Sequence, residues 1–129
     1  MLRFARNDRP EILVKWKKVT PELNVFLDEN MSAFNAVRRP MFGCNAYFVN
    51  GNMFTGTFED SIILRLSEVD RLEITKTFDE VRPFEPVTGR PMKEYVTLPE
   101  SVYEQTDIFR MWLRRSYEYA SSLKPKEKK

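Results

Sequence analysis

The sequence predicts an α+β domain in which helices, including a long C-terminal helix, flank an antiparallel β-sheet. Two observations predict the sheet: apolar side chains recur with a period of two within residues 46–66, and Asn50-Gly51 interrupts them. This dipeptide is typical of a hairpin turn, because both central positions need a positive φ. A third observation predicts the helix, since apolar side chains recur at helical spacing within residues 100–123. We expect the helices to cover one face of the sheet.

The length and composition are those of one ordinary domain. The chain has 129 residues, of which 42% are hydrophobic and 13% aromatic, so it can bury a core without added cross-links. Cys44 is the single cysteine, which excludes an intrachain disulfide and a cysteine cluster for zinc or iron–sulfur. Residues 1–10 contain no apolar run of signal-peptide length, and no stretch approaches the ~20 apolar residues of a membrane span. We therefore expect a soluble, cytoplasmic protein.

The N-terminal part of the chain is expected to contain an arm followed by a helix. Residues 1–19 are predicted to form an extension, either a short strand or a docked arm. Its alternating positions are Ile12, Val14 and Trp16 against Leu13, Lys15 and Lys17. Thr20-Pro21 predicts a helix start, because threonine caps helices and proline is tolerated at the first helical position. We expect this helix over residues 21–35, with Pro40 ending the segment.

A three-stranded meander is the clearest local prediction. Its strands are expected at residues 46–49, 53–58 and 62–66, joined by turns at Asn50-Gly51 and Glu59-Asp60. Gly56 lies within the second strand and indicates either a bulge or close packing. Met53 and Phe54 in the same strand are expected to lie in the core or at an apolar interface.

The second half of the chain is expected to alternate between helix, loop, strand and helix. Ser67 with Asp70 predicts a capped helix over residues 68–78. Proline and glycine predict a loop at 82–91, a fourth strand follows at 92–98, and the last helix lies within 100–123. The resulting division is an arm (1–19), a domain (20–123) and a disordered basic tail (124–129).

The charge is unevenly distributed, although the formal net charge is only +2. Residues 1–18 carry six basic and two acidic side chains, and residues 110–129 carry seven and two, so the middle of the chain is acidic. Basic termini are compatible with an anionic partner such as nucleic acid, for which Arg110, Arg114 and Arg115 are the candidate contacts. The simpler interpretation is a solvated helix face and solubilised chain ends.

The side chains that enzymes most often use are scarce. The chain has no histidine, so it has no Ser-His or Cys-His couple and lacks the commonest general base. The four glycines are scattered, and none forms a phosphate-binding loop. Arg38 and Arg39 are close to Cys44 in the sequence but not evidently close in space, which favours an inert thiol. We therefore expect a non-enzymatic protein without a cofactor or metal.

One polar and aromatic cluster stands out between residues 89 and 96. Its candidate partner-binding or ligand-binding residues are Arg90, Lys93, Glu94 and Tyr95. Arg90 and Lys93 are the groups that would bind an anion, and a small-ligand binder or an enzyme built on this segment stays an alternative. The simpler interpretation is an ordinary entry from a loop into a strand.

Three segments together resemble one protein family. They are MFG and YFVNGNMF at 41–43 and 47–54, FEP and GRPMKEYV at 84–86 and 89–96, and WLRRSYEYA at 112–120. In this order and spacing, over about residues 21–123, the chain resembles the N-terminal domain of the TfoX/Sxy family, in its stand-alone single-domain branch.

This resemblance implies a compact α+β domain, a homodimer and a link to the regulation of natural competence. It also implies that two-domain members act as coactivators alongside the cAMP receptor protein. These members carry a second, helical domain, which the 129 residues lack, so we do not expect the coactivator role to transfer unchanged. No catalytic residue follows from the resemblance. The predicted function is an interaction module acting through protein contacts, with nucleic-acid binding and ligand binding as alternatives.

Overall fold

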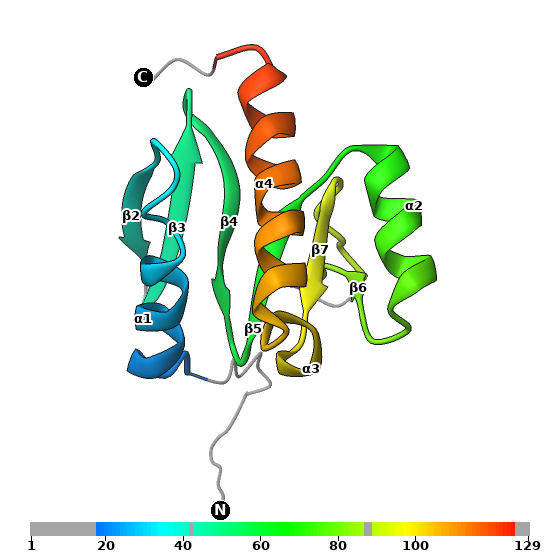
Figure 1. Ribbon diagram of the computed structural model, residues 1–129, viewed down its shortest axis with the longest axis horizontal. Coiled ribbons are helices and arrows are strands. Elements are labelled where there is room, and N and C mark those ends of the chain that lie inside the picture. The colour runs from blue at the N-terminus through cyan, green and yellow to red at the C-terminus, as the bar shows by residue number, and fades with distance from the viewer. Residues whose placement is uncertain (1–17, 42, 87–88, 126–129) are drawn as a thin grey trace, which may run out of the picture.

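The computed structural model describes residues 18–125 except 42, 87 and 88 (Figure 1). This part of the chain forms a six-stranded antiparallel sheet in the order β2-β3-β4-β5-β7-β6, together with four helices. The strands are β2 (Val37–Met41), β3 (Cys44–Val49), β4 (Asn52–Phe58), β5 (Ser61–Arg65), β6 (Arg82–Pro83) and β7 (Tyr95–Leu98). The helices are α1 (Pro21–Glu29), α2 (Glu68–Thr77), α3 (Glu100–Tyr103) and α4 (Thr106–Ser122). The predictions for residues 1–17 and for the tail from residue 126 lie outside the described residues.

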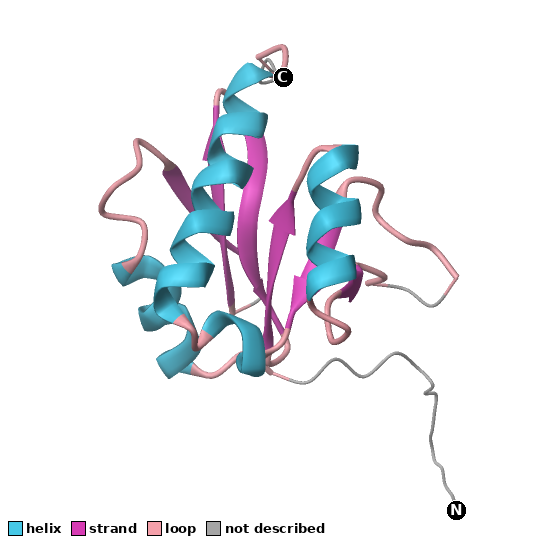
Figure 2. Cartoon of the chain, turned by 45° about the vertical axis from the view of Figure 1, so that its right-hand side comes forward, coloured by secondary structure: helices cyan, strands magenta, loops and turns pink. Residues whose placement is uncertain are grey.

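The predicted α+β fold class is confirmed, and the helices lie on one face of the sheet. Figure 1 and Figure 2 both show α1, α4 and α2 side by side in front of the strands, with α4 across the middle. The described chain begins at the end of the sheet where β4 turns into β5 and leaves α4 at the opposite end. The fold therefore has two layers.

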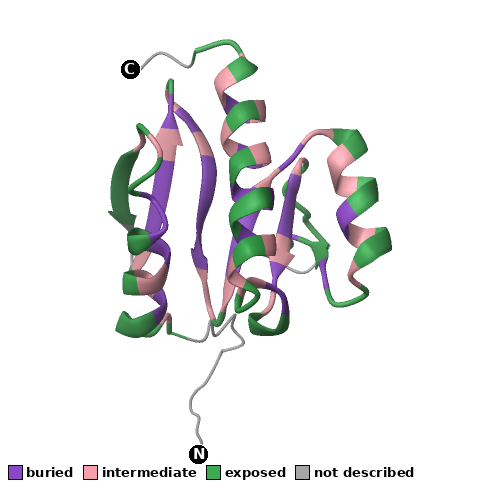
Figure 3. Ribbon diagram, viewed as in Figure 1, coloured by how far each residue is buried: buried purple, intermediate pink, exposed green. Residues whose placement is uncertain are grey.

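The main core lies between these layers and is drawn in purple in Figure 3. Strand residues that face the helices meet the apolar stripe of α4, as the helical spacing predicted. The largest fully buried side chains include Trp112, Tyr47, Phe54, Phe109, Leu27, Ile62, Leu64 and Leu113. Ser116 is buried in the same stripe, and its hydroxyl donates to the carbonyl of Phe54 at 2.7 Å. This bond fastens α4 to the middle of β4.

The predicted caps and turns are confirmed. The hydroxyl of Thr20 accepts from the Leu23 amide at 3.1 Å, and Ser67 accepts from the Asp70 amide at 3.2 Å. Asn50 has φ 53° and Gly51 has φ 80°, as the hairpin turn requires. These local signals set the ends of α1, α2 and the β3–β4 hairpin.

The segment between α1 and β3 differs from the prediction. The helix ends at Glu29 instead of residue 35, and Asn30 closes it by donating its side-chain amide to the Phe26 carbonyl at 2.8 Å. The strand β2 then follows where the sequence predicted only a break at Pro40. An edge strand tolerates proline, because its outer side needs no ladder hydrogen bonds.

The segment from residue 82 to 105 also differs in detail. The short edge strand β6 lies within the predicted loop. The strand β7 begins at Tyr95 instead of residue 92, because Glu94 has a left-handed φ of 79°, which is incompatible with an extended strand at that position. The last helical segment is divided into α3 and α4, with Glu104 and Gln105 between them.

Candidate functional site: the open face of the sheet

The sheet has a second face, which none of the described helices covers, and we call it the open face. Side chains alternate along β5, so that Ile62 and Leu64 enter the main core while Ile63 points to the open face. There Ile63 forms a separate small cluster with Phe84 and Tyr95. The sheet is therefore apolar on both faces, although helices bury only one of them.

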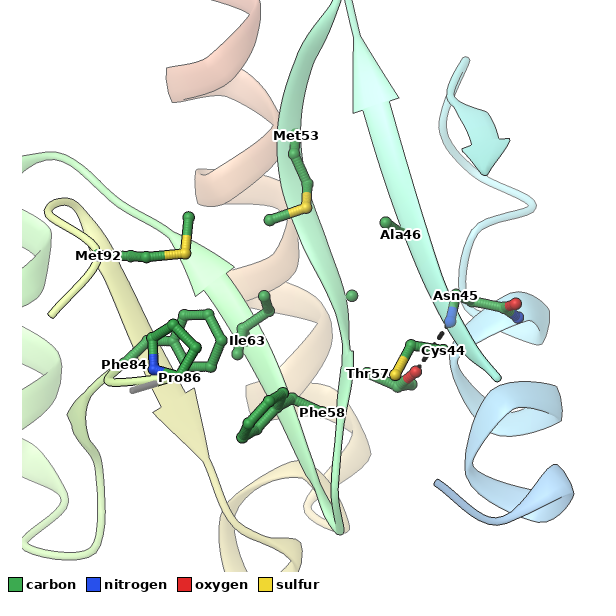
Figure 4. A pocket seen from close by; sticks show the side chains of 11 residues that line it. Cys44, Asn45, Ala46, Met53, Thr57, Phe58, Ile63, Phe84, Pro86 and Met92 are labelled. Atoms are coloured by element: carbon green, nitrogen blue, oxygen red, sulfur yellow. Dashed lines mark hydrogen bonds between the residues drawn. The ribbon is translucent and has the colours of Figure 1, made fainter. Parts of the chain in front are cut away.

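The open face contains a groove of about 250 Å³. Figure 4 looks into it, with α4 behind the sheet. Its apolar walls include Met53, Phe58, Ile63, Phe84 and Met92. The rings of Phe58 and Phe84 meet edge to face, with centroids 4.9 Å apart. These side chains come from three separate parts of the chain, so the groove is a product of the tertiary fold.

Gly56 forms part of the groove and allows β3 and β4 to approach closely. It pairs with Ala46 across the two strands. A Cβ atom at Gly56 would lie 2.8 Å from the carbonyl oxygen of Asn45, which is closer than real Cβ contacts. Of the two alternatives that the sequence left open for this glycine, the structure shows close packing.

Cys44 lies at one end of the groove and is half-buried. Burial raises the pKa of its thiol, and a hydrogen bond with Thr57 only partly opposes this rise. The thiolate is thus disfavoured at neutral pH, in agreement with the prediction of an inert thiol. The hydroxyl of Thr57 also donates to Asn24 of α1 at 2.8 Å, so this end of the groove is tied to the first helix.

A polar cluster centres on Glu94, where the ends of β5 and β7 meet α4. Arg65 donates from Nε to Oε1 of Glu94 at 2.8 Å, and the Tyr119 hydroxyl donates to Oε2 at 2.8 Å. Burial raises the pKa of Glu94, but the hydrogen bonds from Tyr119 and Arg65 and the Arg65 charge outweigh it, so the pKa lies below its ordinary value. Arg65 also lies over the Tyr95 ring, 5.5 Å from its centroid. The cluster joins β5, β7 and α4.

The four residues predicted from the segment 89–96 have different surroundings. Arg90 and Lys93 are exposed. Glu94 belongs to the polar cluster, and Tyr95 is buried with its hydroxyl donating to the Met53 carbonyl at 2.9 Å. The structure thus brings Glu94 and Tyr95 together with Arg65 and Tyr119, two residues that sequence reasoning missed.

The three arginines of α4 point in two directions. Arg110 donates to Asn30 at 2.9 Å, and Arg114 lies over the Phe34 ring at 5.3 Å. Arg115 instead faces α2. It pairs with Asp70 at 3.4 Å and Glu73 at 3.1 Å and lies over the Trp112 ring at 4.5 Å. A nucleic-acid contact by all three would have to include both sides of the helix.

Two other kinds of feature are absent from the described part of the chain. Among them, no group of three or more histidine, cysteine, aspartate or glutamate side chains is placed to hold a metal ion. No helix in the described part of the chain has the length and hydropathy needed to cross a bilayer.

Fold and groove together define the class of protein: a two-layer α+β domain with one sheet face covered by helices and an apolar groove on the other. The family model of the TfoX N-terminal domain matches residues 26–120. The chain therefore belongs to the TfoX N-terminal domain family. No curated protein matches the chain.

Proposed function

We propose that this protein is a non-enzymatic interaction module that acts through protein contacts made by the open face, and that it forms a homodimer there. The observation that supports the proposal is the apolar groove on a sheet face that no described helix covers. Met53, Phe58 and Met92 are the accessible apolar side chains of this groove, and apolar side chains of this kind form the centre of many protein–protein contacts. Membership of the TfoX N-terminal domain family agrees with a module of this type.

The two edges of the sheet are poorly suited to forming the dimer contact. The outer strand β2 contains Arg38, Arg39 and Pro40, and the opposite outer strand β6 consists of Arg82 and Pro83. Proline removes a ladder donor, and like charges oppose the pairing of two identical edges. A two-fold dimer uses the same patch on both copies, so an apolar face is self-complementary in chemistry. Two such faces pack about 10 Å apart.

Light scattering of the full chain during size exclusion tests the dimer. We expect a mass of two chains at micromolar concentration and a shift toward the monomer on dilution. A clean monomer throughout the micromolar range would contradict the homodimer and leave only contacts with other proteins.

The regulatory role is a separate part of the proposal and rests on the family resemblance, which implies a link to competence or transcription. Deleting the gene and measuring transcript levels across the genome tests it. We expect a defined set of transcripts to change and to recover when the gene is restored. Unchanged transcript levels under competence-inducing conditions would remove the regulatory role.

A small apolar ligand is the second candidate, because Met92 places part of the predicted segment 89–96 at the groove. The groove is smaller than most ligand pockets, which enclose roughly 300–1,000 Å³. A ligand that binds the folded state raises the melting temperature by mass action. A thermal-shift screen with apolar metabolites and short fatty acids tests this alternative, and no shift at millimolar concentration would exclude those ligands.

A further inference from the structure

We propose that a depression between α4 and the turn after α1 binds a phosphate group, and that Arg110 and Arg114 are the residues that bind it. The depression has a volume of about 260 Å³ and is lined by these two arginines and by residues of the segment 29–34. It lies on the helical layer, so the site is separate from the groove of the open face and does not depend on the proposed dimer. Spacing, fixed orientation, charge and unused donors support it.

The two arginines lie on the same face of α4. They are four residues apart, and side chains at this spacing are neighbours on a helix surface, with Cβ atoms about 5–6 Å apart. Both arginines are exposed, and both line the depression. A single group bound in the depression can therefore contact both guanidinium groups.

A buried amide fixes the orientation of Arg110. The Nε of Arg110 donates to Oδ1 of Asn30 at 2.9 Å. Asn30 is only 8% exposed, and its Nδ2 donates to the Phe26 carbonyl at 2.8 Å, so the amide cannot turn without losing a bond. Because Arg110 uses Nε for this contact, its two Nη groups stay available to a ligand.

An aromatic ring fixes the orientation of Arg114. Its guanidinium lies over the Phe34 ring, 5.3 Å from the centroid, and Phe34 in turn packs against Tyr117 with ring centroids 4.9 Å apart. A guanidinium stacked on a ring still presents its N–H groups at its edge, where they donate to acceptors. Two arginines that are already oriented lose less side-chain entropy on binding than two free ones.

The charge of the depression favours an anion. Among the described residues, no carboxylate forms an ion pair with Arg110 or Arg114, whereas the adjacent Arg115 pairs with both Asp70 and Glu73. Glu29 is the one acidic side chain in the lining, where it faces two arginines. The lining therefore keeps a net positive charge that a bound anion neutralises.

The chemistry of the donors favours a phosphate over a carboxylate. A single guanidinium already satisfies a carboxylate through two parallel N–H bonds. A phosphate monoester carries a charge of about −1.5 to −2 at pH 7 and has three acceptor oxygens, which suits two guanidinium groups. The lining also includes Ser32 and Ala33, whose amides donate to no acceptor in the described part of the chain. These amides are two further unused donors.

A titration of the full chain with phenyl phosphate, followed by ¹⁵N–¹H NMR, tests the proposal. We expect saturable shifts at the Nε signal of Arg110 and at the amides of the segment 29–34. Arg114→Gln should weaken binding at least tenfold. Arg90→Gln is the matched control, because Arg90 is exposed and is not part of the lining, and it should leave the affinity within twofold of the unchanged chain.

Two further variants keep both arginines and change only the charge beside them. Glu29→Gln removes the acidic side chain of the lining and should tighten binding at least twofold. Ser32→Asp adds a carboxylate and should weaken binding about as much as Arg114→Gln. Opposite effects of these two variants would show that a loss of binding does not come from a loss of folding. Equal affinities in both variants and in the unchanged chain would overturn the proposal.

The source of the phosphate is decided by a second titration. The backbone of a nucleic acid supplies phosphate diesters, each with a single charge, whereas a small metabolite supplies a monoester. We expect phenyl phosphate to bind more tightly per phosphate than an oligonucleotide without terminal phosphates. Tighter binding of the oligonucleotide, with the same loss in Arg114→Gln, would assign the site to a nucleic-acid backbone and contradict the monoester. No saturable shift with either probe at millimolar concentration would overturn the site.

Discussion

The two faces of the sheet differ although the same strands build them, and β4 shows the difference within one element. Phe54 is fully buried beneath the helices, where its ring lies 6.2 Å from Phe34 and 5.4 Å from Tyr117. Phe58, four residues later, is only partly buried and meets Phe84 on the open face. The comparison indicates that the covered face supplies most of the stability, which leaves the open face available for binding.

Truncating the two phenylalanines tests whether the covered face contributes more to stability than the open face. Phe54→Ala removes a fully buried ring and should lower the free energy of unfolding by about 3–5 kcal/mol. Phe58→Ala removes a partly solvated ring and should cost about 1–2 kcal/mol, the range of an ordinary substitution. Urea denaturation followed by circular dichroism measures both values. Equal losses would mean that the open face is as important for folding as the covered face.

The position of Gly56 gives the next largest effect. Gly56→Ala introduces a Cβ atom 2.8 Å from the Asn45 carbonyl, so β3 and β4 must move apart. Overpacking of this kind costs about 1–3 kcal/mol. Thermal denaturation should show a lower melting temperature for this variant. An unchanged melting temperature would show that the two strands separate without cost and that the groove is not rigid.

Two serines of α4 test how much the hydrogen bonds of a buried and an exposed side chain on this helix contribute to stability. Ser116→Ala leaves the buried Phe54 carbonyl without its side-chain donor and should cost about 1–2 kcal/mol. Ser122 donates to the Tyr119 carbonyl at 2.7 Å but is exposed, so Ser122→Ala should change stability by less than about 0.5 kcal/mol. Chemical denaturation of both variants makes the comparison. A larger loss in Ser122→Ala would contradict the assigned burial.

The smallest expected effect concerns Glu94 and is revealed by pH. The pKa of Glu94 is depressed in the folded state. Its contribution to the free energy of unfolding is therefore present above the ordinary glutamate pKa of about 4.3 and is lost as pH falls below that value. Glu94→Gln should therefore be less stable than the unchanged chain at pH 7, by less than about 1 kcal/mol, and the difference should shrink toward pH 3. A difference that grows on acidification would contradict the ion pair with Arg65.

The parts of the fold that the sequence predicts are those with local signals. Asn50-Gly51, Thr20-Pro21 and Ser67 determine turns and caps within a few residues, and each was predicted correctly. The edge strands β2 and β6 were missed because both contain proline and lack a clear alternation. Only pairing with a neighbouring strand shows that they belong to the sheet.

The candidate site depends on contacts that no local pattern contains. Arg65 and Tyr95 meet because β5 pairs with β7 in antiparallel register, across 30 positions of the chain. The groove needs Met53 from β4 together with Phe84 and Met92 from the later loop. Phe54 lies in the core, as expected, and Met53 lies at the groove of the open face. Which of the two faces each residue occupies follows only from the side that the helices cover.

The central claim is that the open face is the contact surface of this protein. Sedimentation equilibrium of the full chain with a matched pair of variants tests it most directly. Met92 at the groove and Met111 on α4 have similar exposed fractions, 39% and 45%. The account predicts that Met92→Asp weakens the dimer at least tenfold and that Met111→Asp leaves it unchanged. A dimer that survives Met92→Asp but dissociates in Met111→Asp would place the contact on the helical layer and contradict the account.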